Sequence, residues 1–596
     1  MINATLSNEG SETPASAVSQ NVVGSTSFLT SADLAILLGL HPWNPVVPLL
    51  ASALRLRRLN KLHAAIAAAS DRPFLDAFLE QMQIRVEICG VGGNAIPAEG
   101  PVVIVANHPY GAVDGLALLW AVQRVRPDVR VMANRMLGLV APLRDKWIAV
   151  DPLRTSAAPA ANTRGFRECI RHLQDGRALI VFPAGEVSAH HEGSVVPVDK
   201  TWDTSVMKLI QRVGAPVVPV YIPGTNSSMF YRLGQIHPRL RTLALPSELL
   251  NKTGTTVSLT FGNAIPWTDL EGINEPEMLA RNLRSRVYAL GSSSRPTAIK
   301  ADSPAIAAGF APSAVAAEID RYRESCLCGQ GEFDVYLIPG DAAPAVLHEV
   351  GRRREITFRA VGEGTGTALD IDAIDRWYEH LVLWHRPTQQ IAGAYRLGHG
   401  GRIVRERGLD GLYITTLFDV DAKAGRLLAS SLELGRSFVI SEFQRHRLPL
   451  FLLWQGILTY LERHPELRRV IGPVSISADY SMVSMQCIAA FFQRQSAASA
   501  FAGSVVPHHP IPPPAAGIDL DALLAPIGND LRALDRLVRS MEGGSAGVPV
   551  LVRKYAQQHA TIVAFSHDPA FCNALDGFMV LEVDDIPEEL RVMSMA

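Results

Sequence analysis

Short, uninterrupted apolar runs alternate with longer mixed stretches in the first half of the chain. The clearest runs are Val102–Val105, Ala178–Phe182 and Pro216–Tyr221. Runs of this length, with no polar residue at alternate positions, are typical of parallel strands that are buried on both faces. Because these strands alternate with helical stretches, we predict an α/β domain over residues 84–291.

The stretch before this domain is apolar but does not suit a membrane span. Residues 34–54 carry no charge, but Pro42, Pro45 and Pro48 would break a helix exposed to lipid. The following residues, 54–62, are basic and amphipathic, which favours contact with an anionic membrane surface. We predict that residues 31–83 form an interfacial helical region of a peripheral protein. A core helix with solvated arginines is the alternative.

Amino-acid composition predicts the remaining domain boundaries of the chain. Residues 1–30 are rich in Ser, Thr, Asn and Gly and lack the pattern of a signal peptide, so we predict a disordered tail. A stretch dominated by Ser, Ala and Pro predicts a linker over residues 292–318. A second domain is expected over residues 319–596, with a Pro-rich surface excursion at 503–516.

Overall charge and cysteine content limit the kinds of function that this chain can have. The chain has 596 residues, too many for one domain of ordinary size. Its 56 Lys and Arg against 58 Asp and Glu exclude the strongly basic character of a nucleic-acid-binding protein. Six dispersed cysteines form neither a disulfide framework nor a paired zinc pattern, so we expect no metal. With a mean hydropathy of +0.13, the chain is expected to be an apolar cytosolic enzyme whose cysteines are reduced.

A histidine and an aspartate follow the first buried strand. The strand at Val102–Val105 leads through Asn107 into His108, and Asp114 comes six residues later. A carboxylate beside an imidazole fixes its tautomer and stabilises its protonated form, so that the free nitrogen can take a proton from a hydroxyl. A loop histidine next to a helix-capping aspartate would give the same pattern, and the pair alone does not decide between the two.

Three further blocks make this region resemble the glycerolipid acyltransferase superfamily. The hallmark Asn-His with a nearby Asp is followed in the family's order by segments 147–151, 182–188 and 215–220. The resemblance implies that His108 is the general base and that Asp114 orients it. It also implies substrate contacts by Asn107, Gly111, Phe182, Pro183, Gly185, Glu186 and Pro219.

Two departures from the family pattern bear on the substrate. Five residues, not four, separate His108 from Asp114, and the third block has Ala184 and Val187 where the family has Glu and Arg. The family's Arg is associated with the phosphate of the acceptor, a task that suits a guanidinium. Its absence argues against a glycerol phosphate acceptor. The variant blocks resemble acyltransferases of aminolipid synthesis, in which Glu186 could meet a cationic group of the acceptor.

The second domain carries an ordered set of charged residues. Any single one of them could be a strand-edge salt bridge or a solvated loop residue. As a set they resemble the acyl-homoserine-lactone synthases, a GNAT-fold group, and more closely the ornithine N-acyltransferases. The matching residues are Arg354, Phe358, Asp370, Asp372, Arg396, Glu433 and Arg436.

The resemblance and the residue types suggest a role for each of these side chains. An α-ammonium must lose a proton before it attacks a thioester, and Glu433 is the candidate base. Asp370 and Asp372 would hold the cationic groups of the amino acid, and Arg396 or Arg436 its carboxylate.

The sequence also bears on the acyl donor. The pyrophosphate loop of coenzyme-A-using GNAT enzymes is not evident, so acyl carrier protein is the expected donor, acyl-CoA is less expected, and no cofactor is predicted. Because the carrier is acidic, the arginines at positions 352, 353, 405 and 407 are candidate docking contacts.

Together the two halves resemble the bifunctional ornithine-lipid synthases of bacteria. The resemblance implies an N-terminal glycerolipid-acyltransferase-like α/β domain and a C-terminal GNAT-like α/β domain. The second domain would acylate ornithine with a 3-hydroxyacyl chain, and the first would then esterify the hydroxyl of lyso-ornithine lipid at the cytoplasmic face of the inner membrane. Two alternatives stay open: a monofunctional lysophospholipid or glycerolipid O-acyltransferase whose second domain binds carrier protein, and a non-enzymatic membrane-binding protein.

Overall fold

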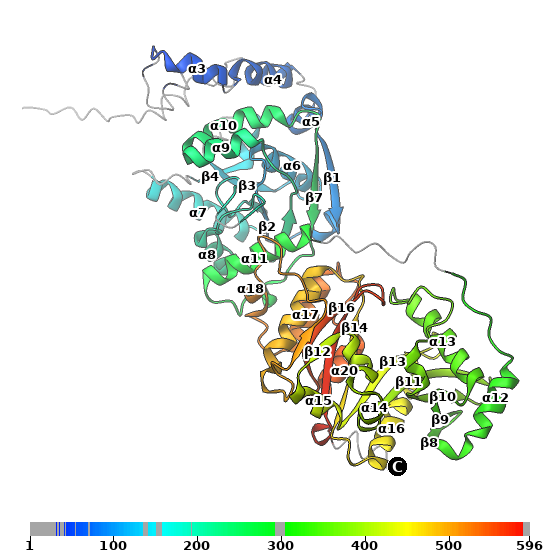
Figure 1. Cartoon of the computed structure of the whole chain (residues 1–596). Helices are drawn as coiled ribbons and strands as arrows, with labels where there is room; N and C mark the ends of the chain where they lie inside the picture. Colours follow the sequence, from blue (N-terminus) through cyan, green and yellow to red (C-terminus); the bar gives the residue numbers. More distant parts are fainter. Residues whose placement is uncertain are drawn as a thin grey trace, which may run out of the picture. The chain divides into compact units, whose positions relative to one another are not determined.

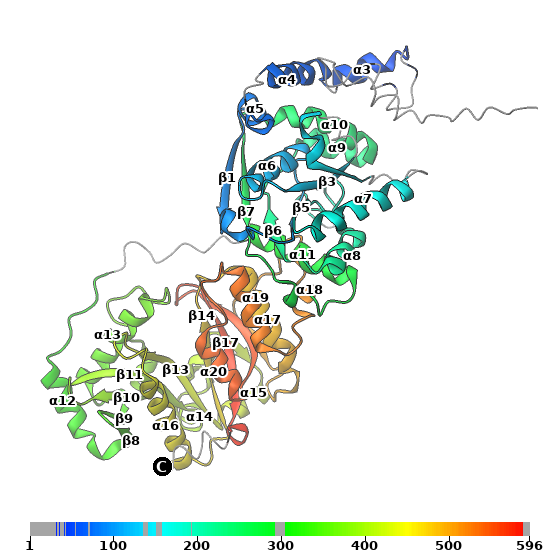
Figure 2. The same ribbon diagram turned by 180° about the vertical axis from the view of Figure 1, so that it is seen from behind.

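The computed structural model describes residues 31, 35, 41, 43–53, 55–68, 72–134, 141–150, 158–191, 194–292 and 304–587. The chain forms two compact units, shown from two sides in Figures 1 and 2. The first unit comprises Met1–Ser292 with Ala515–Pro526, and the second comprises Ser293–Pro514 with Ile527–Ala596. Residues 515–526, which the sequence places in the second domain, therefore belong to the first unit.

The first unit is built on a seven-stranded sheet in the order β1-β7-β6-β2-β5-β3-β4. All neighbouring strands are parallel except β6 and β7. Along β2, Val102 and Ile104 enter one apolar core while Val103 and Val105 enter the other, so the strand is buried on both faces as its composition predicts. The strands are β1 Arg85–Gly90, β2 Val102–Ala106, β3 Arg130–Asn134, β4 Trp147–Val150, β5 Ala178–Val181, β6 Val217–Tyr221 and β7 Thr256–Phe261.

Helices cover both faces of this sheet. Side chains of α5 and α6 line one core, and side chains of α7, α8 and α11 line the other. A short helix from late in the chain, α18 (Leu520–Leu524), packs on α11. The others are α5 Phe74–Gln81, α6 Ala112–Gln123, α7 Ala158–Gln174, α8 Thr204–Val213, α9 Ser228–Ile236, α10 Pro238–Asn251 and α11 Pro276–Gly291.

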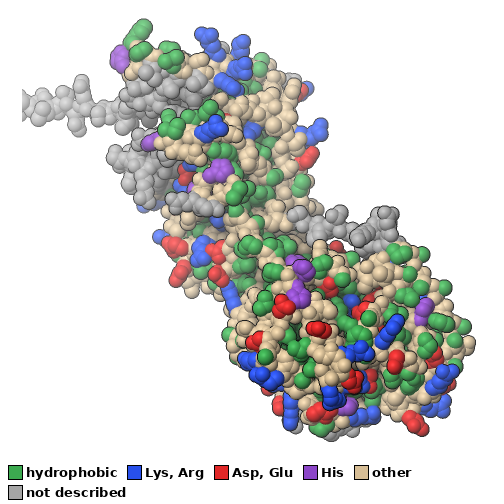
Figure 3. All heavy atoms as spheres, viewed as in Figure 1, with side chains coloured by type: hydrophobic (Ala, Val, Ile, Leu, Met, Phe, Trp, Pro, Cys, Tyr) green, Lys and Arg blue, Asp and Glu red, His purple; other side chains and the backbone are tan. Residues whose placement is uncertain are grey.

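In the part of the chain that the structure describes, α3 (Val46–Ala53) and α4 (Leu56–Ala68) precede α5. Trp43 and Leu49 are 88% and 71% exposed, and Lys and Arg side chains gather over α4 in Figure 3. Among the described residues, no helix combines the length and the apolar character needed to cross a membrane. The tail predicted at residues 1–30 lies outside the described residues.

The second unit is built on an eight-stranded sheet in the order β16-β17-β14-β13-β11-β10-β9-β8. Its pairs are antiparallel except β13 with β14, whose pairing covers only Ser431–Glu433 against Arg469–Ile471. The strands are β8 Cys326–Gln330, β9 Phe333–Pro339, β10 Glu379–His385, β11 Gln390–His399, β13 Ser431–Val439, β14 Arg469–Ile476, β16 Thr561–Asp568 and β17 Ala574–Glu582.

Two boundaries predicted for this half need correction. Helix α12 begins at Pro312, inside the expected linker, because a proline at the first helical position is pre-organised for helix. Within the Pro-rich excursion, β15 (Val505–Pro507) pairs with β12 (Phe418–Val420), because its two valines keep the backbone N–H groups that a strand needs and Pro507 stands at its end. The remaining helices are α13 Pro344–Arg359, α14 Gly400–Arg407, α15 Ala422–Leu428, α16 Arg447–Arg463, α17 Met482–Gln495, α19 Leu531–Met541 and α20 Val550–Gln557.

Candidate active sites

The first candidate site lies where β2 ends and α6 begins. The Nδ1 atom of His108 is 3.0 Å from Asp114 Oδ2, and the Asp114 side chain is fully buried while that of His108 is 19% exposed. The same Asp114 oxygen accepts hydrogen bonds from the backbone N–H groups of Tyr110 (2.8 Å) and Gly111 (2.9 Å). Asp114 is therefore held in one position, and it leaves the Nε2 atom of His108 as the nitrogen that can accept a proton.

The backbone of His108 is fixed at both ends by residues that follow β5. Its N–H donates to Asp199 Oδ1 (3.2 Å), and its carbonyl oxygen accepts from the N–H of Ser188 (2.9 Å). Ser188 Oγ donates to the same oxygen of Asp199 at 2.6 Å. Asp199 is buried, and burial raises the pKa of its carboxyl group although Ser188 and Trp202 donate hydrogen bonds to it.

Two residues predicted to bind substrate instead shape the loop. The side chain of Asn107 donates to the carbonyl of Ile222 (2.8 Å) and accepts from its N–H (2.7 Å), which ties the end of β2 to the residue after β6. Gly111 has a φ of +104°, and a Cβ there would lie 3.1 Å from Leu245. Both therefore position the loop.

The third sequence block contributes one direct neighbour of the histidine. The ring of Phe182 lies 4.4 Å from that of His108, centroid to centroid. Gly185, at φ +67°, donates to the carbonyl of Phe182, and Pro183 accepts from Asp203, so this part of the block forms a tight turn. Pro219, also predicted to contact substrate, is buried within β6, where its carbonyl accepts from Gly262, and it belongs to the sheet.

Glu186 is neutralised by this chain's own cations. Its two carboxylate oxygens lie 2.8 Å from Lys200 Nζ and 2.7 Å from Arg241 NH2. The expectation that Glu186 is free to meet a cation of the acceptor therefore needs correction, since two cations already face it. The trio has one negative and two positive groups, and it adjoins the Ser188–Asp199 pair in the sequence.

The second candidate site lies in the second unit, where buried arginines and aspartates alternate. Asp375 Oδ1 accepts from Arg354 (2.8 Å) and Arg396 (3.3 Å), and Arg396 also donates to both oxygens of Asp372 (2.9 and 2.8 Å). Burial opposes ionisation of Asp375, but the two guanidinium groups outweigh it and hold its pKa well below the usual range. Burial and Arg354 lower the pKa of His380 to about 4, so its neutral Nδ1 accepts from Arg354.

Arg436 forms the other half of this cluster. Its Nε is 3.5 Å from Asp370 Oδ1, and burial raises the pKa of Asp370 despite that neighbour. The guanidinium lies over the rings of Phe571 (4.5 Å) and Tyr413 (5.2 Å), and Phe571 packs on Phe358. The structure thus brings together six of the seven residues predicted for this site in one charged cluster with an aromatic wall.

The seventh residue, Glu433, uses its carboxylate in hydrogen bonds within the protein. It accepts hydrogen bonds from the N–H groups of Tyr413 (3.1 Å) and Ile414 (2.6 Å) and from the hydroxyl of Tyr378. The side chain is buried, and burial raises its pKa. This geometry does not suit the expected role of general base. It makes Glu433 the residue that holds the Tyr413 segment against β13.

Two other carboxylates of this region have pKa values near neutrality. Asp576, on β17, accepts from Ser475 Oγ at 2.5 Å, and burial raises its pKa to about 7. Burial also raises the pKa of Glu363 to about 7, with Asp576 and Asp479 adding to the effect. A base is most effective when its pKa is near the working pH. Asp568 joins the same region by accepting from Tyr413 Oη (3.0 Å).

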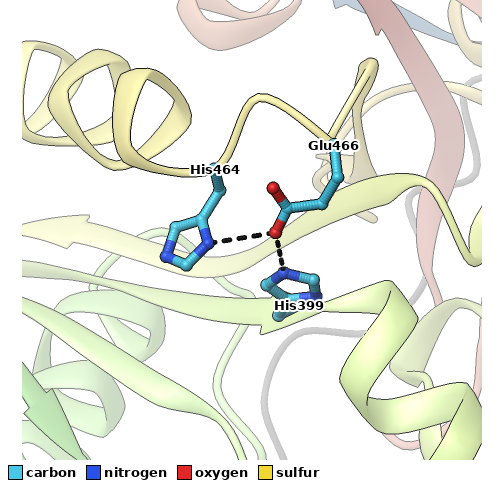
Figure 4. Close-up of side chains that lie close together, drawn as sticks. All are labelled: His399, His464 and Glu466. Atoms are coloured by element: carbon cyan, nitrogen blue, oxygen red, sulfur yellow. Dashed lines mark hydrogen bonds and ion pairs between the residues drawn. The ribbon is translucent and has the colours of Figure 1, made fainter.

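Three side chains in the described part of the second unit could offer metal ligands: His399, His464 and Glu466, shown in Figure 4. However, His399 Nδ1 accepts from the N–H of Arg402 (3.3 Å) at the start of α14, so its Nε2 carries the proton and donates to Glu466 (3.0 Å). A metal at Nε2 would need the other tautomer and would break this helix cap. The group is therefore a hydrogen-bonded trio.

Several residues of both sites were not predicted from the sequence. Asp199 and Asp375 are central to the first and second site. Asp576 lies some 140 residues after Glu433 along the chain. An aspartate directly after the apolar run 195–198 is the one signal that could have pointed to Asp199.

Comparison with known proteins places these sites in a family context. Residues 54–295 match the family model described as "Acyltransferase", and residues 353–455 match "Acetyltransferase (GNAT) domain". A glycine N(alpha)-acyltransferase of Bacteroides thetaiotaomicron is 28% identical over 292 residues, which are 46% of this chain and 85% of that protein. A lyso-glycine lipid O-acyltransferase of the same organism is 30% identical over 227 residues, 36% of this chain and 79% of that protein.

A solved structure, the 1-acyl-sn-glycerophosphate acyltransferase PlsC of Thermotoga maritima, is 18% identical, covers 39% of this chain and 83% of its own, and gives a TM-score of 0.24. The two family matches contain the His108–Asp114 site and most of the arginine and aspartate cluster. The chain is an acyltransferase with a GNAT domain in its second unit, and it belongs to the family that includes the lyso-glycine lipid O-acyltransferases.

Proposed function

We propose that this chain makes ornithine lipid in two steps. The second unit transfers a 3-hydroxyacyl chain from acyl carrier protein to the α-amine of ornithine. The first unit then transfers a second acyl chain to the 3-hydroxyl of the resulting lyso-lipid. The observation that carries the proposal is that one chain holds a His108–Asp114 base for a hydroxyl and a separate cluster of arginines and carboxylates suited to an amino acid.

The charge balance of the second site supports a dibasic substrate. The arginines at 354, 396 and 436 are matched by the aspartates at 370, 372 and 375. Asp576, Asp568 and Glu363 remain as additional carboxylates near Arg436 and Tyr413. An amino acid with a second ammonium group would compensate these charges. Glycine, the amino acid named for one relative, has no such group and is the second candidate acceptor.

The proposed first step needs one proton acceptor. Asp576, with a pKa of about 7, takes a proton from the α-ammonium, and the free amine attacks the thioester carbon of the acyl carrier. The carbon–sulfur bond breaks as the amide forms, and the leaving thiolate takes the second proton that the attacking nitrogen loses. Among the described residues, buried nitrogens of Arg396 and Arg436 that make no hydrogen bond supply donors for the amino acid's carboxylate.

The proposed second step uses the first site. His108 Nε2 takes the proton of the 3-hydroxyl as the oxygen attacks a second thioester, and the imidazolium formed is stabilised by Asp114, 3.0 Å away. The same proton then goes to the departing thiolate. The lyso-lipid head group carries a carboxylate, which suits Lys200 and Arg241, because these two cations are balanced by only one carboxylate, Glu186.

A hollow of about 640 Å³ in the first unit is a candidate docking site for the acidic carrier protein. It is lined by five arginines against two carboxylates. Arg164, Arg167 and Arg171 come from α7, and Arg130 and Arg177 lie at the starts of β3 and β5. The chemistry needs the carrier as co-substrate and no bound cofactor. Arg352 and Arg353, expected to be docking contacts, are instead each 2.7 Å from Glu349.

Membrane contact is proposed for the N-terminal helices. Arg57, Arg58 and Lys61 are exposed on α4, and Trp43 and Leu49 are exposed nearby in the chain. Basic and apolar side chains together favour an anionic lipid surface, the cytoplasmic face of the inner membrane in this proposal.

Reconstitution with purified full-length protein tests the proposed function. Acyl carrier protein loaded with a 3-hydroxyacyl chain and a second acyl carrier are incubated with ornithine, lysine or glycine, and products are identified by mass spectrometry. The proposal expects a mono-acyl and then a diacyl ornithine lipid, with ornithine giving at least tenfold higher kcat/KM than glycine. If glycine is preferred, glycine takes the place of ornithine as the proposed acceptor, and the two-step scheme is retained.

The same assay addresses a glycerolipid acceptor. Under that alternative, lysophosphatidate would be acylated in place of the lyso-aminolipid. The position of the family's phosphate-binding arginine is here Val187, which is 6% exposed and lies against the Gly111 turn. Efficient acylation of lysophosphatidate without any aminolipid product would refute the proposal.

A further inference from the structure

A segment from the second half of the chain completes the first unit. Residues 515–526 belong to this unit, although the residues on both sides of them in the sequence belong to the second. The segment is bound to α11 by specific contacts. Asp519 pairs with Arg281 (2.6 Å) and its N–H donates to Ser285 Oγ (2.9 Å), and Asn282 Nδ2 donates to the carbonyl of Ala522 (2.8 Å).

The first glycine of this segment lies against a tyrosine ring. Gly517 has a φ of +94°, and a Cβ at this position would lie 2.6 Å from two ring atoms of Tyr288. The carbonyl of Gly517 accepts from Arg284 NH1 (3.2 Å), and the guanidinium of Arg284 lies 5.0 Å from the centre of the Tyr288 ring. The segment thus packs directly on two side chains of α11.

These two side chains hold the backbone of Asp199. The N–H of Asp199 donates to Tyr288 Oη (2.7 Å), and its carbonyl accepts from Arg284 NH2 (2.7 Å). The carboxylate of Asp199 in turn accepts from the N–H of His108 (3.2 Å) and from Ser188 Oγ. A continuous chain of contacts therefore runs from Gly517 through Tyr288 and Arg284 to Asp199 and His108.

We infer that residues 515–526 are a positioning element of the hydroxyl-acylating site, acting through Tyr288, Arg284 and Asp199 on the backbone of His108. None of these residues touches the reacting atoms. They fix the position and orientation of the loop that carries the imidazole. A shift of about 1 Å in a catalytic group lowers a rate by up to 10²-fold. The inference rests on the proposed function of the first unit.

The consequence is that O-acylation depends on a piece of chain inserted within the amine-acylating half. Both ends of the segment are joined covalently to the second unit. A change at Gly517 or Tyr288 should therefore slow the second step while the first step proceeds, and the mono-acyl lipid should accumulate.

The test compares single substitutions in the full-length protein. Gly517→Ala pushes a methyl group into the Tyr288 ring, and Tyr288→Phe removes only the hydroxyl that accepts from Asp199. Gly528→Ala is the matched control, because Gly528 also has a positive φ (+55°) but has no atom within 4 Å of the added Cβ. Steady-state kinetics of O-acylation and N-acylation are measured for each, with circular dichroism to verify folding.

The inference expects kcat for O-acylation to fall on the order of tenfold in both variants. KM for the lyso-lipid and the N-acylation rate should stay within about twofold of wild type, and Gly528→Ala should match wild type in both reactions. A loss of folded protein would instead lower the circular dichroism signal together with the rates.

Two results would overturn the inference: wild-type O-acylation in both variants, or a fall in kcat for O-acylation matched by an equal fall in the N-acylation rate. Failure of the proposed function gives a different result, because the wild-type protein itself would then not acylate the lyso-lipid. If Gly517→Ala does not fold, the milder Tyr288→Phe decides the question.

Discussion

Replacing Asp114 with asparagine separates the charge of this residue from its hydrogen bonds. Asp114 Oδ2 lies 3.0 Å from His108 Nδ1 and accepts from the N–H groups of Tyr110 and Gly111, whereas Oδ1 is buried without a hydrogen-bond partner among the described residues. In Asp114→Asn the amide oxygen can take the place of Oδ2 and the amide nitrogen that of Oδ1. The loop and the histidine tautomer are then preserved, and the negative charge beside the imidazole is lost.

The size of the effect follows from the 3.0 Å separation of Nδ1 and Oδ2. At an effective dielectric constant of about 20, the attraction between imidazolium and carboxylate at this distance is about 5 kcal/mol, as an upper bound. The amide dipole retains part of that stabilisation. We therefore expect the barrier to rise by about 2–4 kcal/mol, which lowers kcat for O-acylation by roughly 30- to 1,000-fold.

The assay measures initial rates of acyl transfer from acyl carrier protein to a purified N-acyl-ornithine, with His108→Ala as the reference for a missing base. N-acylation of ornithine by the same preparation reports whether the protein is folded. If Asp114→Asn retains O-acylation within twofold of wild type while His108→Ala is inactive, stabilisation of the imidazolium by Asp114 is not part of the mechanism.

Three further results are expected. Gly111→Ala should destabilise the first unit by about 1–3 kcal/mol, since φ is +104° and Leu245 lies 3.1 Å away; thermal unfolding measures this. Arg241→Met should raise KM for the lyso-lipid about tenfold with little change in kcat, if this cation holds the head group. For Asp576, the native pKa of about 7 exceeds the usual 3.8, so the native state binds the proton more tightly and stability falls as pH rises between these values. Asp576→Asn should remove that fall, which is up to about 1.4 kcal/mol per pH unit, and should also abolish N-acylation. An unchanged pH dependence of unfolding would show that Asp576 ionises normally.

The strands and the first site could be predicted because their signals are local. Valine and isoleucine runs are sufficient to indicate a strand buried on both faces, and Val102–Val105 is one. His108 and Asp114 are six positions apart and lie on one loop and the first turn of one helix. The α/β character of the first unit follows from the same local patterns, whereas that of the second was predicted from the resemblance to GNAT enzymes.

The roles of individual side chains were harder to predict, because they depend on partners distant in the sequence. The motif around Glu433 predicts a base, but its carboxylate accepts hydrogen bonds from backbone N–H groups some 20 residues earlier in the chain. Glu186 reads as a free carboxylate, yet Arg241 reaches it from α10. The segment 515–526 is short and carries no pattern of its own, so only the three-dimensional contacts assign it to the first unit.

The central claim is that one chain carries out two acyl transfers in order, and lipid analysis tests it most directly. Total lipid is extracted from a bacterial host that lacks aminolipids and expresses the wild-type chain, His108→Ala or Asp576→Asn, and is analysed by mass spectrometry. The account predicts a diacylated ornithine lipid from wild type, only the mono-acyl lipid from His108→Ala, and neither from Asp576→Asn. A diacylated aminolipid from His108→Ala, or altered phospholipids with no aminolipid from wild type, would contradict it.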